Sequence, residues 1–320
     1  MEKNKLDSLK RMTPSMRKIV DFEAKEAKRI LDKLGEDANE KRIYEELRLF
    51  WNQEAPDVKE EKEIFLSGSV GEFRVKLFYP EKKAQGNYEC IIFIHGGGFT
   101  VGSIESHEGI VKRLANETGA MVASVDYHLA PTYKYPVQLN ECVQVLEHLY
   151  ENAEAYQIDQ NQLSVAGDSA GANLSLAVAL KMRDENRKVQ LKSMLLYYGS
   201  FGLKDSRSMH LYGGYWDGLK FEDLAYYKKI YAEEAFLEDK YRNLLNSDLT
   251  YGLSPAYIMA CDLDPLQDDS ILLKEIFDEH GIKNTFEMYE GVIHGFLHYS
   301  SQLEEAYASI KSSAKFYNEL

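Results

Sequence analysis

The chain is 320 residues long, with 44% hydrophobic residues and a formal net charge of −14 at pH 7. This length and apolar content suit one domain with an accessory cap, and the acidic balance argues against nucleic acid or an anionic membrane as a partner. No apolar run approaches the roughly 18 residues of a membrane span, and the first residues lack the apolar core of a signal peptide. We therefore expect a cytoplasmic protein.

Two amphipathic helices are predicted at the start of the chain. The first begins after Thr13, a favourable N-cap residue before Pro14, and its apolar residues recur at helical spacing until Gly35. The second runs through Trp51 and ends before Pro56.

From residue 58 onward the hydrophobic period changes. Residues 73–79 alternate between apolar and polar as a strand does. Strands and helices then follow one another, with strands at 91–94, 120–126, 163–166, 193–198, 255–261 and 284–290, and helices at about 106–118, 136–152, 170–186 and 266–280. Strands separated by helices form a mostly parallel sheet with helices on both faces, so the predicted fold class is α/β.

The alternation stops between residues 201 and 251, where helical stretches occur but no strand is evident. Two interpretations remain open. The large rings of this segment can pack on one another in ordinary helices, or the segment can form a lid over a functional site. The aromatic residues concerned are Tyr212, Tyr215, Trp216, Phe221, Tyr226, Tyr227, Tyr231, Phe236 and Tyr241.

Two glycine-rich motifs follow two of the predicted strands. Strand 91–94 leads into residues 95–99 (HGGGF), and strand 163–166 leads into residues 167–171 (GDSAG). Their small residues allow turns too tight for a side chain, at the strand ends where an α/β sheet displays its chemistry. The second motif has the form of a nucleophile elbow and the first that of an oxyanion loop, and their joint occurrence by chance is far rarer than either alone. Ser169 is therefore the candidate nucleophile.

A serine hydroxyl needs a base to take its proton, and the base needs a carboxylate to hold its tautomer. In hydrolases with this elbow the acid and then the histidine follow the serine, each after a later strand. Asp264 is the preferred acid because it precedes Pro265, which biases it away from helix. The alternative is that Asp264 only caps the next helix. The carboxylates that follow strand 255–261 are Asp262, Asp264, Asp268 and Asp269.

One histidine stands where the base is expected. His294 follows strand 284–290 on a loop before the final helix. His298 is the rival base, and its place one turn further along favours a supporting or surface role. Solvated side chains are expected for His107, His148, His210 and His280, which lie in charged or helical surroundings.

The cysteines and histidines give no sign of a metal centre. Cys90, Cys142 and Cys261 are odd in number and lie within or beside apolar segments, so buried free thiols are expected. The chain has no Cys-x-x-Cys pattern and no His pair at ligand spacing with acidic neighbours. We predict neither a metal nor a cofactor.

The motifs make the chain similar to a known family. It resembles the hormone-sensitive-lipase-like esterases of the α/β-hydrolase superfamily, a bacterial group with HGGG and GDSAG motifs. Further matches are residues 126–131 (DYHLAP, against a family pattern of DYRLAP), 264–266 (DPL) and 294–296 (HGF). Two departures, His128 for Arg and Thr132 for the common Glu, affect residues expected in a supporting ion pair. What they put in doubt is local rigidity more than chemistry.

The resemblance implies an organisation and a set of site residues. It implies one α/β-hydrolase domain over residues 1–320, with a helical cap formed by about residues 1–55 and about 201–250. By position it implies Ser169 as nucleophile, Asp264 as acid and His294 as base. The oxyanion hole would be formed by the backbone N–H groups of Gly97, Gly98 and Ala170. The residues expected to bind substrate are Phe99, Tyr212 and Trp216.

These features together predict a serine carboxylesterase. It would hydrolyse short-acyl esters, acetyl to butyryl, of small alcohols or sugars through an acyl-enzyme. Two alternatives remain open: a non-catalytic small-molecule receptor on the same scaffold, and an amidase or peptidase that uses the same triad. The expected partner is a small-molecule ester, with no nucleic acid and no membrane, and a homo-oligomer is left open.

Overall fold

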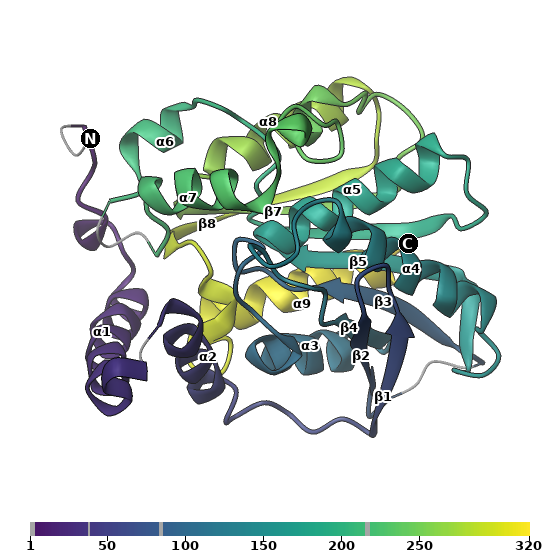
Figure 1. Cartoon of the computed structure of the whole chain (residues 1–320), viewed down its shortest axis with the longest axis horizontal. Helices are drawn as coiled ribbons and strands as arrows, with labels where there is room; N and C mark the ends of the chain where they lie inside the picture. The colour runs from purple at the N-terminus through teal and green to yellow at the C-terminus, as the bar shows by residue number, and fades with distance from the viewer. Residues whose placement is uncertain (1–3, 38, 83–85, 215–217) are drawn as a thin grey trace.

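The centre of the molecule is one β-sheet (Figure 1). The computed structural model describes residues 4–37, 39–82, 86–214 and 218–320. Its strands are β1 (Glu60–Ser67), β2 (Glu72–Tyr79), β3 (Tyr88–Ile94), β4 (Met121–Val125), β5 (Ile158–Asp168), β6 (Leu191–Tyr197), β7 (Ala256–Leu263) and β8 (Asn284–Ile293). They lie in the order β1-β2-β4-β3-β5-β6-β7-β8. The pairs β1/β2 and β2/β4 are antiparallel and the other neighbours are parallel, which confirms the predicted α/β class and mostly parallel sheet.

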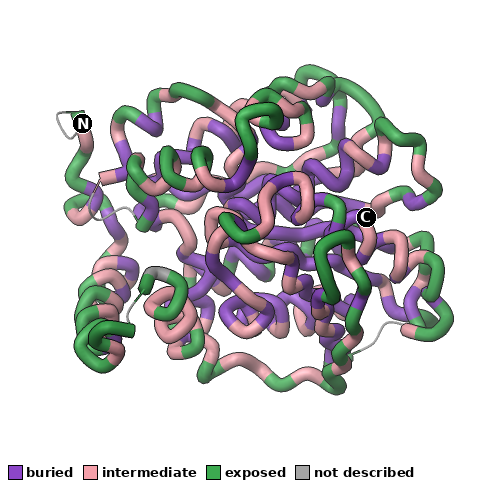
Figure 2. Tube along the Cα trace, viewed as in Figure 1, coloured by how far each residue is buried: buried purple, intermediate pink, exposed green. Residues whose placement is uncertain are grey.

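Strand β3 illustrates why the sheet forms the core. Ile91 and Phe93 belong to one hydrophobic cluster, whereas Ile92 and Ile94 belong to a second. Successive side chains of a strand point to opposite faces, so the two clusters lie on the two sides of the sheet. A parallel strand buried on both faces has a continuous apolar sequence, which is the pattern that predicted it. Figure 2 shows the buried residues concentrated through the middle of the molecule.

Helices cover both faces of the sheet, as predicted. Helices α3 (Ile104–Thr118) and α9 (Glu304–Asn318) are among those that contribute buried residues to the cluster of Phe93. Those that contribute to the cluster of Ile92 are α4 (Val137–Glu151), α5 (Ala170–Asp184) and α8 (Gln267–Glu279). A short 3-10 helix, η5 (Phe296–Tyr299), precedes α9.

The two N-terminal helices form where the sequence predicts them, as α1 (Pro14–Leu34) and α2 (Glu40–Trp51). Thr13 caps α1, because its Oγ1 accepts a hydrogen bond from the Met16 N–H at 3.2 Å. Met16 and Trp51 are buried in the same cluster as α3 and α9. Helices α1 and α2, side by side at the left of Figure 1, therefore complete the core on that face of the sheet.

The segment after β6 interrupts the alternation, also as predicted. It contains α6 (Arg207–Leu211), α7 (Phe221–Tyr231), and the short helices η3 (Glu234–Phe236) and η4 (Leu244–Asn246). No strand occurs in its described parts, 201–214 and 218–250. Tyr231, at the end of α7, is buried in the cluster that α4, α5 and α8 share. This segment is therefore packed onto the sheet domain.

Strand β1 is the part of the sheet that the sequence analysis did not predict. It begins with Glu60, Glu61, Lys62 and Glu63, and Leu66 is its one buried residue. It lies at the edge of the sheet and is held by antiparallel pairing with β2. Main-chain hydrogen bonds can hold an edge strand without an apolar face, so the hydrophobic pattern carries little sign of it.

Two further expectations concern the cysteines and the membrane. All three cysteines are buried and free, as predicted. Within the described ranges, none of the helices has the length and apolar character needed to cross a bilayer.

Candidate active site

Ser169 lies at the sharp turn between β5 and α5. Its backbone has φ +54° and ψ −116°, a conformation that residues other than glycine rarely adopt. Its N–H donates a hydrogen bond to the Tyr197 carbonyl at 2.8 Å. The flanking glycines allow close approach of the backbone. A Cβ on Gly167 would lie 2.4 Å from the Gly171 oxygen, and a Cβ on Gly171 would lie 1.9 Å from the Ile94 oxygen. The motif therefore places Ser169 in the tight turn between β5 and α5, at the carboxyl end of the strand.

Two residues from later loops meet Ser169. His294 follows β8, and its Nε2 lies 2.8 Å from Ser169 Oγ. Its Nδ1 lies 2.7 Å from Oδ2 of Asp264, which follows β7 and is buried. The other oxygen of Asp264 accepts the Leu266 N–H at 2.8 Å, so the carboxylate is fixed at both atoms. The structure brings the three sequence-predicted residues into one hydrogen-bonded chain.

The neighbouring carboxylates have other partners. Asp268 accepts the Ser208 N–H at 2.7 Å, and Asp262 lies 3.7 Å from Arg11 in an ion pair. Asp269 is buried, and its Oδ1 accepts several backbone N–H groups at the start of the segment after β6. Burial raises the pKa of Asp269 to about 6 although those hydrogen bonds oppose it. Of the four candidate acids, only Asp264 contacts His294 within the described chain.

The glycine loop after β3 presents unpaired backbone donors. Gly97 and Gly98 have φ of +110° and +59°, values that favour glycine. Among the described residues, none accepts a hydrogen bond from the N–H groups of Gly97, Gly98 or Ala170. Gly98 and Ala170 line the same pocket as Ser169. Unsatisfied N–H groups beside a nucleophile can receive the negative charge that develops on a carbonyl oxygen.

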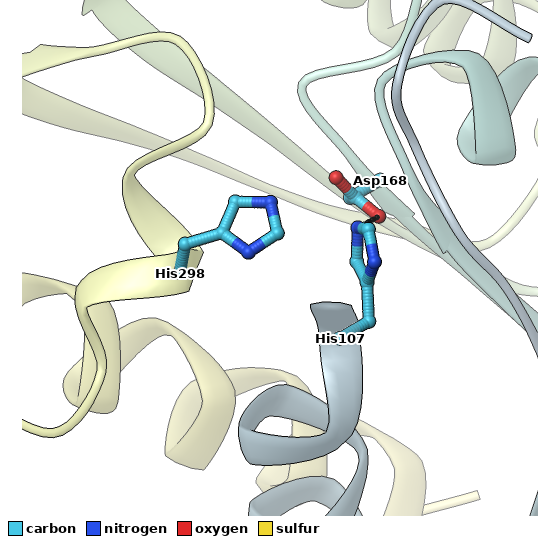
Figure 3. A group of neighbouring side chains, drawn as sticks. All are labelled: His107, Asp168 and His298. Carbon is cyan, nitrogen blue, oxygen red and sulfur yellow. Dashed lines mark ion pairs between the residues drawn. The ribbon is translucent and has the colours of Figure 1, made fainter. Parts of the chain in front are cut away.

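A buried carboxylate connects this loop to the elbow. Asp168 precedes Ser169, and its Oδ1 accepts the Gly96 N–H at 2.8 Å. His107 Nε2 lies 3.3 Å from the same oxygen (Figure 3). Burial alone would raise the pKa of Asp168, but the His107 ring and the Gly96 N–H outweigh it and hold the pKa below its usual range. The expectation that His107 is solvated is wrong, because the inner face of α3 buries it against Asp168.

His298, the rival base, lies behind the site. It is buried, its ring is 4.6 Å from that of His107, and its Nε2 is 3.4 Å from the Tyr44 hydroxyl. Burial lowers its pKa well below the usual value for histidine. His298 therefore occupies a supporting position, one of the two roles expected, and has no hydrogen bond to Ser169.

Figure 3 shows the one group of side chains in the described chain with potential metal ligands close together. Ligand atoms of His107, Asp168 and His298 lie within 4.8 Å of one another. Sequence spacing could not reveal this group, because its members come from α3, β5 and η5. Asp168 Oδ1 already accepts the Gly96 N–H, so the group joins the glycine loop after β3 to the elbow.

His128 and Thr132 are the two residues that depart from the family pattern. His128 Nδ1 lies 2.7 Å from Oε1 of the buried Glu141, whose Oε2 accepts the His128 N–H at 2.8 Å. A hydrogen-bonded pair of His128 and Glu141 thus stands where the ion pair was expected, and Thr132 is exposed. His210 and His280 are exposed as predicted, whereas His148 is partly buried, with its Nε2 2.8 Å from the Tyr156 hydroxyl.

A pocket of about 320 Å³ lies beside Ser169. The Phe99 ring lines it and stacks on Tyr231 of α7, with ring centroids 3.6 Å apart. Many lining residues belong to the segment after β6, including Leu224, Tyr227, Tyr231 and Arg242. Within the described residues, α1 and α2 contribute none. The segment after β6, and not the N-terminal helices, therefore encloses this pocket.

The three residues expected to bind substrate differ in position. Phe99 lines the pocket. Tyr212 does not: it is buried in the cluster of α3 and α9, and its hydroxyl accepts a hydrogen bond from Arg11 at 2.8 Å. Trp216 lies outside the described residues. Aromatic content alone cannot distinguish a ring that lines a pocket from one that packs in a core.

A sequence model of the alpha/beta hydrolase fold family matches residues 91–298, which contain both glycine motifs, Asp264 and His294. Serine, aspartate and histidine, linked by hydrogen bonds after the carboxyl ends of β5, β7 and β8, agree with that match. The chain is an α/β-hydrolase.

Comparison with individual proteins narrows the class. The chain is similar to the acetyl esterases of Salmonella choleraesuis (strain SC-B67) and Salmonella typhi, each 35% identical over 316 residues that cover 98% of this chain and 96% of that protein. It is also similar in structure to an ester hydrolase from the metagenome of Lake Arreo, with a TM-score of 0.88, 26% identity, and coverage of 96% of this chain and 98% of that one. For a Pyrobaculum calidifontis esterase the TM-score is 0.85, at 27% identity and the same coverage. The chain belongs to the hormone-sensitive-lipase-like carboxylesterases of the α/β-hydrolase fold family.

Proposed function

We propose that this carboxylesterase hydrolyses acetyl to butyryl esters of small alcohols or sugars through an acyl-enzyme on Ser169. The observation that carries the proposal is the chain from Ser169 to His294 to Asp264, with hydrogen-bond distances of 2.8 and 2.7 Å. The acetyl esterases among its relatives support the choice of a short acyl group.

The proposed mechanism uses groups of the protein and water. His294 Nε2 takes the Ser169 proton as Oγ attacks the ester carbonyl, while Asp264 holds the Nδ1–H tautomer and stabilises the imidazolium. The negative carbonyl oxygen receives hydrogen bonds from the N–H groups of Gly97, Gly98 and Ala170. His294 then donates its proton to the departing alkoxide, and the alcohol leaves. Water, activated by the same histidine, releases the acid and restores Ser169.

The pocket supports a short substrate. Its volume of about 320 Å³ is near the lower end of the range for small-molecule sites. The stacked rings of Phe99 and Tyr231 close part of its wall. A long acyl chain would need an open groove, whereas an acetyl or butyryl group needs only a short cavity.

We therefore expect kcat/KM to be highest for acetyl to butyryl esters and to fall steeply beyond about six to eight acyl carbons, because the longer esters would exceed the pocket volume of about 320 Å³. A series of 4-nitrophenyl esters from acetate to decanoate measures this, beside acetylated saccharides for the sugar class. A rate that climbs through decanoate, or jumps above the critical micelle concentration, would contradict the short pocket. Adding 4-nitroacetanilide, the amide that matches the acetate, tests the amidase alternative.

The oxyanion loop gives a second prediction. In Gly97→Ala the new Cβ would lie 2.2 Å from the Val101 oxygen, and in Gly98→Ala 2.6 Å from the Tyr227 ring. Either change displaces a backbone donor, so we expect kcat to fall at least about 10²-fold, the usual effect of one lost oxyanion donor. Affinity for a phosphonate inhibitor should fall in parallel.

The matched control for these variants is Gly281→Ala. Gly281 has φ +67°, near the +59° of Gly98, but a Cβ there would meet no atom within 4 Å. It therefore has the same kind of backbone strain at a distance from the loop. Normal kinetics in both Gly97→Ala and Gly98→Ala would mean that the loop is only structural.

A further inference from the structure

The pocket beside Ser169 has a charge opposite to that of the whole protein. The chain carries a net charge of −14. Yet the charged side chains that line the pocket are Lys204, Lys228 and Arg242, and no described lining residue is Asp or Glu. Lys204 is already neutralised, because its Nζ lies 2.9 and 2.8 Å from the two carboxylate oxygens of Glu238. The other two cations that line the pocket are Lys228 and Arg242.

Arg242 is buried without a carboxylate partner. It is 7% exposed. Its Nη1 donates to the Leu237 carbonyl at 2.8 Å and its Nη2 to the Lys228 carbonyl at 3.1 Å, while its Nε has no acceptor in the described structure. Among the described residues no carboxylate forms an ion pair with Arg242. Burial lowers the pKa of its guanidinium, and the more distant charges of Glu238 and Asp239 oppose that shift without cancelling it. A buried charge is normally paired, since desolvation is costly.

A hydrogen bond links Arg242 to α5, the helix that follows the nucleophile. Asn173 lies one turn after Ser169 on α5, and its Nδ2 donates to the Arg242 carbonyl at 3.1 Å. Lys228 lies on α7, which forms another wall of the same pocket. Its side chain is exposed and makes no ion pair with the described residues. One buried and one exposed cation therefore reach the pocket from two elements.

We propose that the pocket selects esters that carry a carboxylate, which Arg242 and Lys228 bind while Ser169 attacks the ester carbonyl. A planar guanidinium matches a carboxylate, and the N–H groups of Nη1 and Nη2 that do not bind the two carbonyls would gain a charged acceptor. Lys228 would add a second positive charge at the exposed side. The inference rests on the proposed esterase function and specifies its substrate class.

Two matched pairs of substrates test the proposal. Monoethyl succinate and ethyl succinamate differ by a carboxylate or an amide on the acyl side. The pair 4-acetoxybenzoate and 4-acetoxybenzamide differs in the same way on the alcohol side. Each kcat/KM is divided by the rate constant of hydroxide hydrolysis, which removes intrinsic reactivity. We expect the anionic member to be preferred about tenfold in at least one pair, the effect of one charged hydrogen bond.

Three variants test which residues cause the preference for the anionic substrate. Arg242→Gln should abolish it, mainly through KM, and Lys228→Gln should lower it about threefold, as expected for an exposed charge. Lys229→Gln is the matched control, because it removes the same charge from the next position of α7 but Lys229 does not line the pocket. It should leave the ratio unchanged. If Arg242→Gln does not fold, Lys228→Gln still provides the test.

The failure of this inference can be separated from failure of the proposed function. Loss of 4-nitrophenyl acetate hydrolysis in Ser169→Ala tests the esterase alone. If the wild type hydrolyses the acetate but prefers the anionic member of neither pair, the inference is overturned. It is also overturned if Lys228→Gln and Lys229→Gln change the ratio equally, because the effect would then come from overall charge and not from the pocket.

Discussion

Ser169→Ala is expected to lower kcat for 4-nitrophenyl acetate by about 10⁵- to 10⁶-fold while the protein stays folded. The substitution removes one atom, Oγ, which in the proposed mechanism both attacks the ester and gives its proton to His294 Nε2, 2.8 Å away. Because alanine has no nucleophile, only the rate that the oxyanion donors and binding supply would remain. Steady-state kinetics and circular dichroism of the purified variant measure the two parts of this prediction.

Labelling gives an independent readout of the same residue. An organophosphate should modify the wild type once per chain and should not modify Ser169→Ala, as mass spectrometry would show. Ser200 also lines the pocket, so Ser200→Ala is the matched variant and should still be labelled. If Ser169→Ala keeps more than a few per cent of the esterase activity, the nucleophile assignment is wrong.

The second large effect is expected for Asp264→Asn, with a fall in kcat of about 10⁴-fold. An amide at this position would favour the wrong tautomer of His294, whose Nδ1 is now 2.7 Å from Oδ2. Asn at Asp262 or Asp268 should cost far less, because those carboxylates contact Arg11 and a backbone N–H. Equal losses at Asp264 and Asp268, with folding unchanged, would overturn the choice of acid.

The base is tested in the same way. His294→Ala should reduce kcat far more than His298→Ala. His298 is buried beside Tyr44 and His107, so its loss should lower the melting temperature more than the rate of the chemical step. The opposite order of activities would exchange the roles of the two histidines.

The site residues that directly follow a strand could be predicted from the sequence. Ser169, Asp264 and His294 follow β5, β7 and β8, and parallel neighbours place their carboxyl ends along one edge of the sheet. A motif that directly follows a predicted strand therefore also indicates which distant residues lie close to it. That Asp264 contacts His294 while Asp262 and Asp268 do not depends on turn geometry, which Pro265 indicated only in part.

The errors share a physical cause. His107 stands between charged neighbours in the sequence, but the face of α3 that carries it is turned toward Asp168, and no local pattern reveals a partner on another element. Tyr212 lies in an aromatic segment whose rings divide between the pocket and a core cluster. The cap of about residues 1–55 and about 201–250 stays a prediction; in the described chain only the second segment lines the pocket. The lid role, the cytoplasmic location and self-association stay predictions.

The charged strand β1 has a consequence for how the molecule behaves at high concentration. It is the last strand on its side of the sheet, so its outer main-chain groups could template a further strand. Glu60, Glu61, Lys62 and Glu63 place charged side chains along the first half of this strand. A second chain that paired with β1 would have to cover these charges, and charged side chains on an edge strand oppose such pairing. The residues that made β1 hard to predict from the sequence would therefore also oppose edge-to-edge aggregation of the protein.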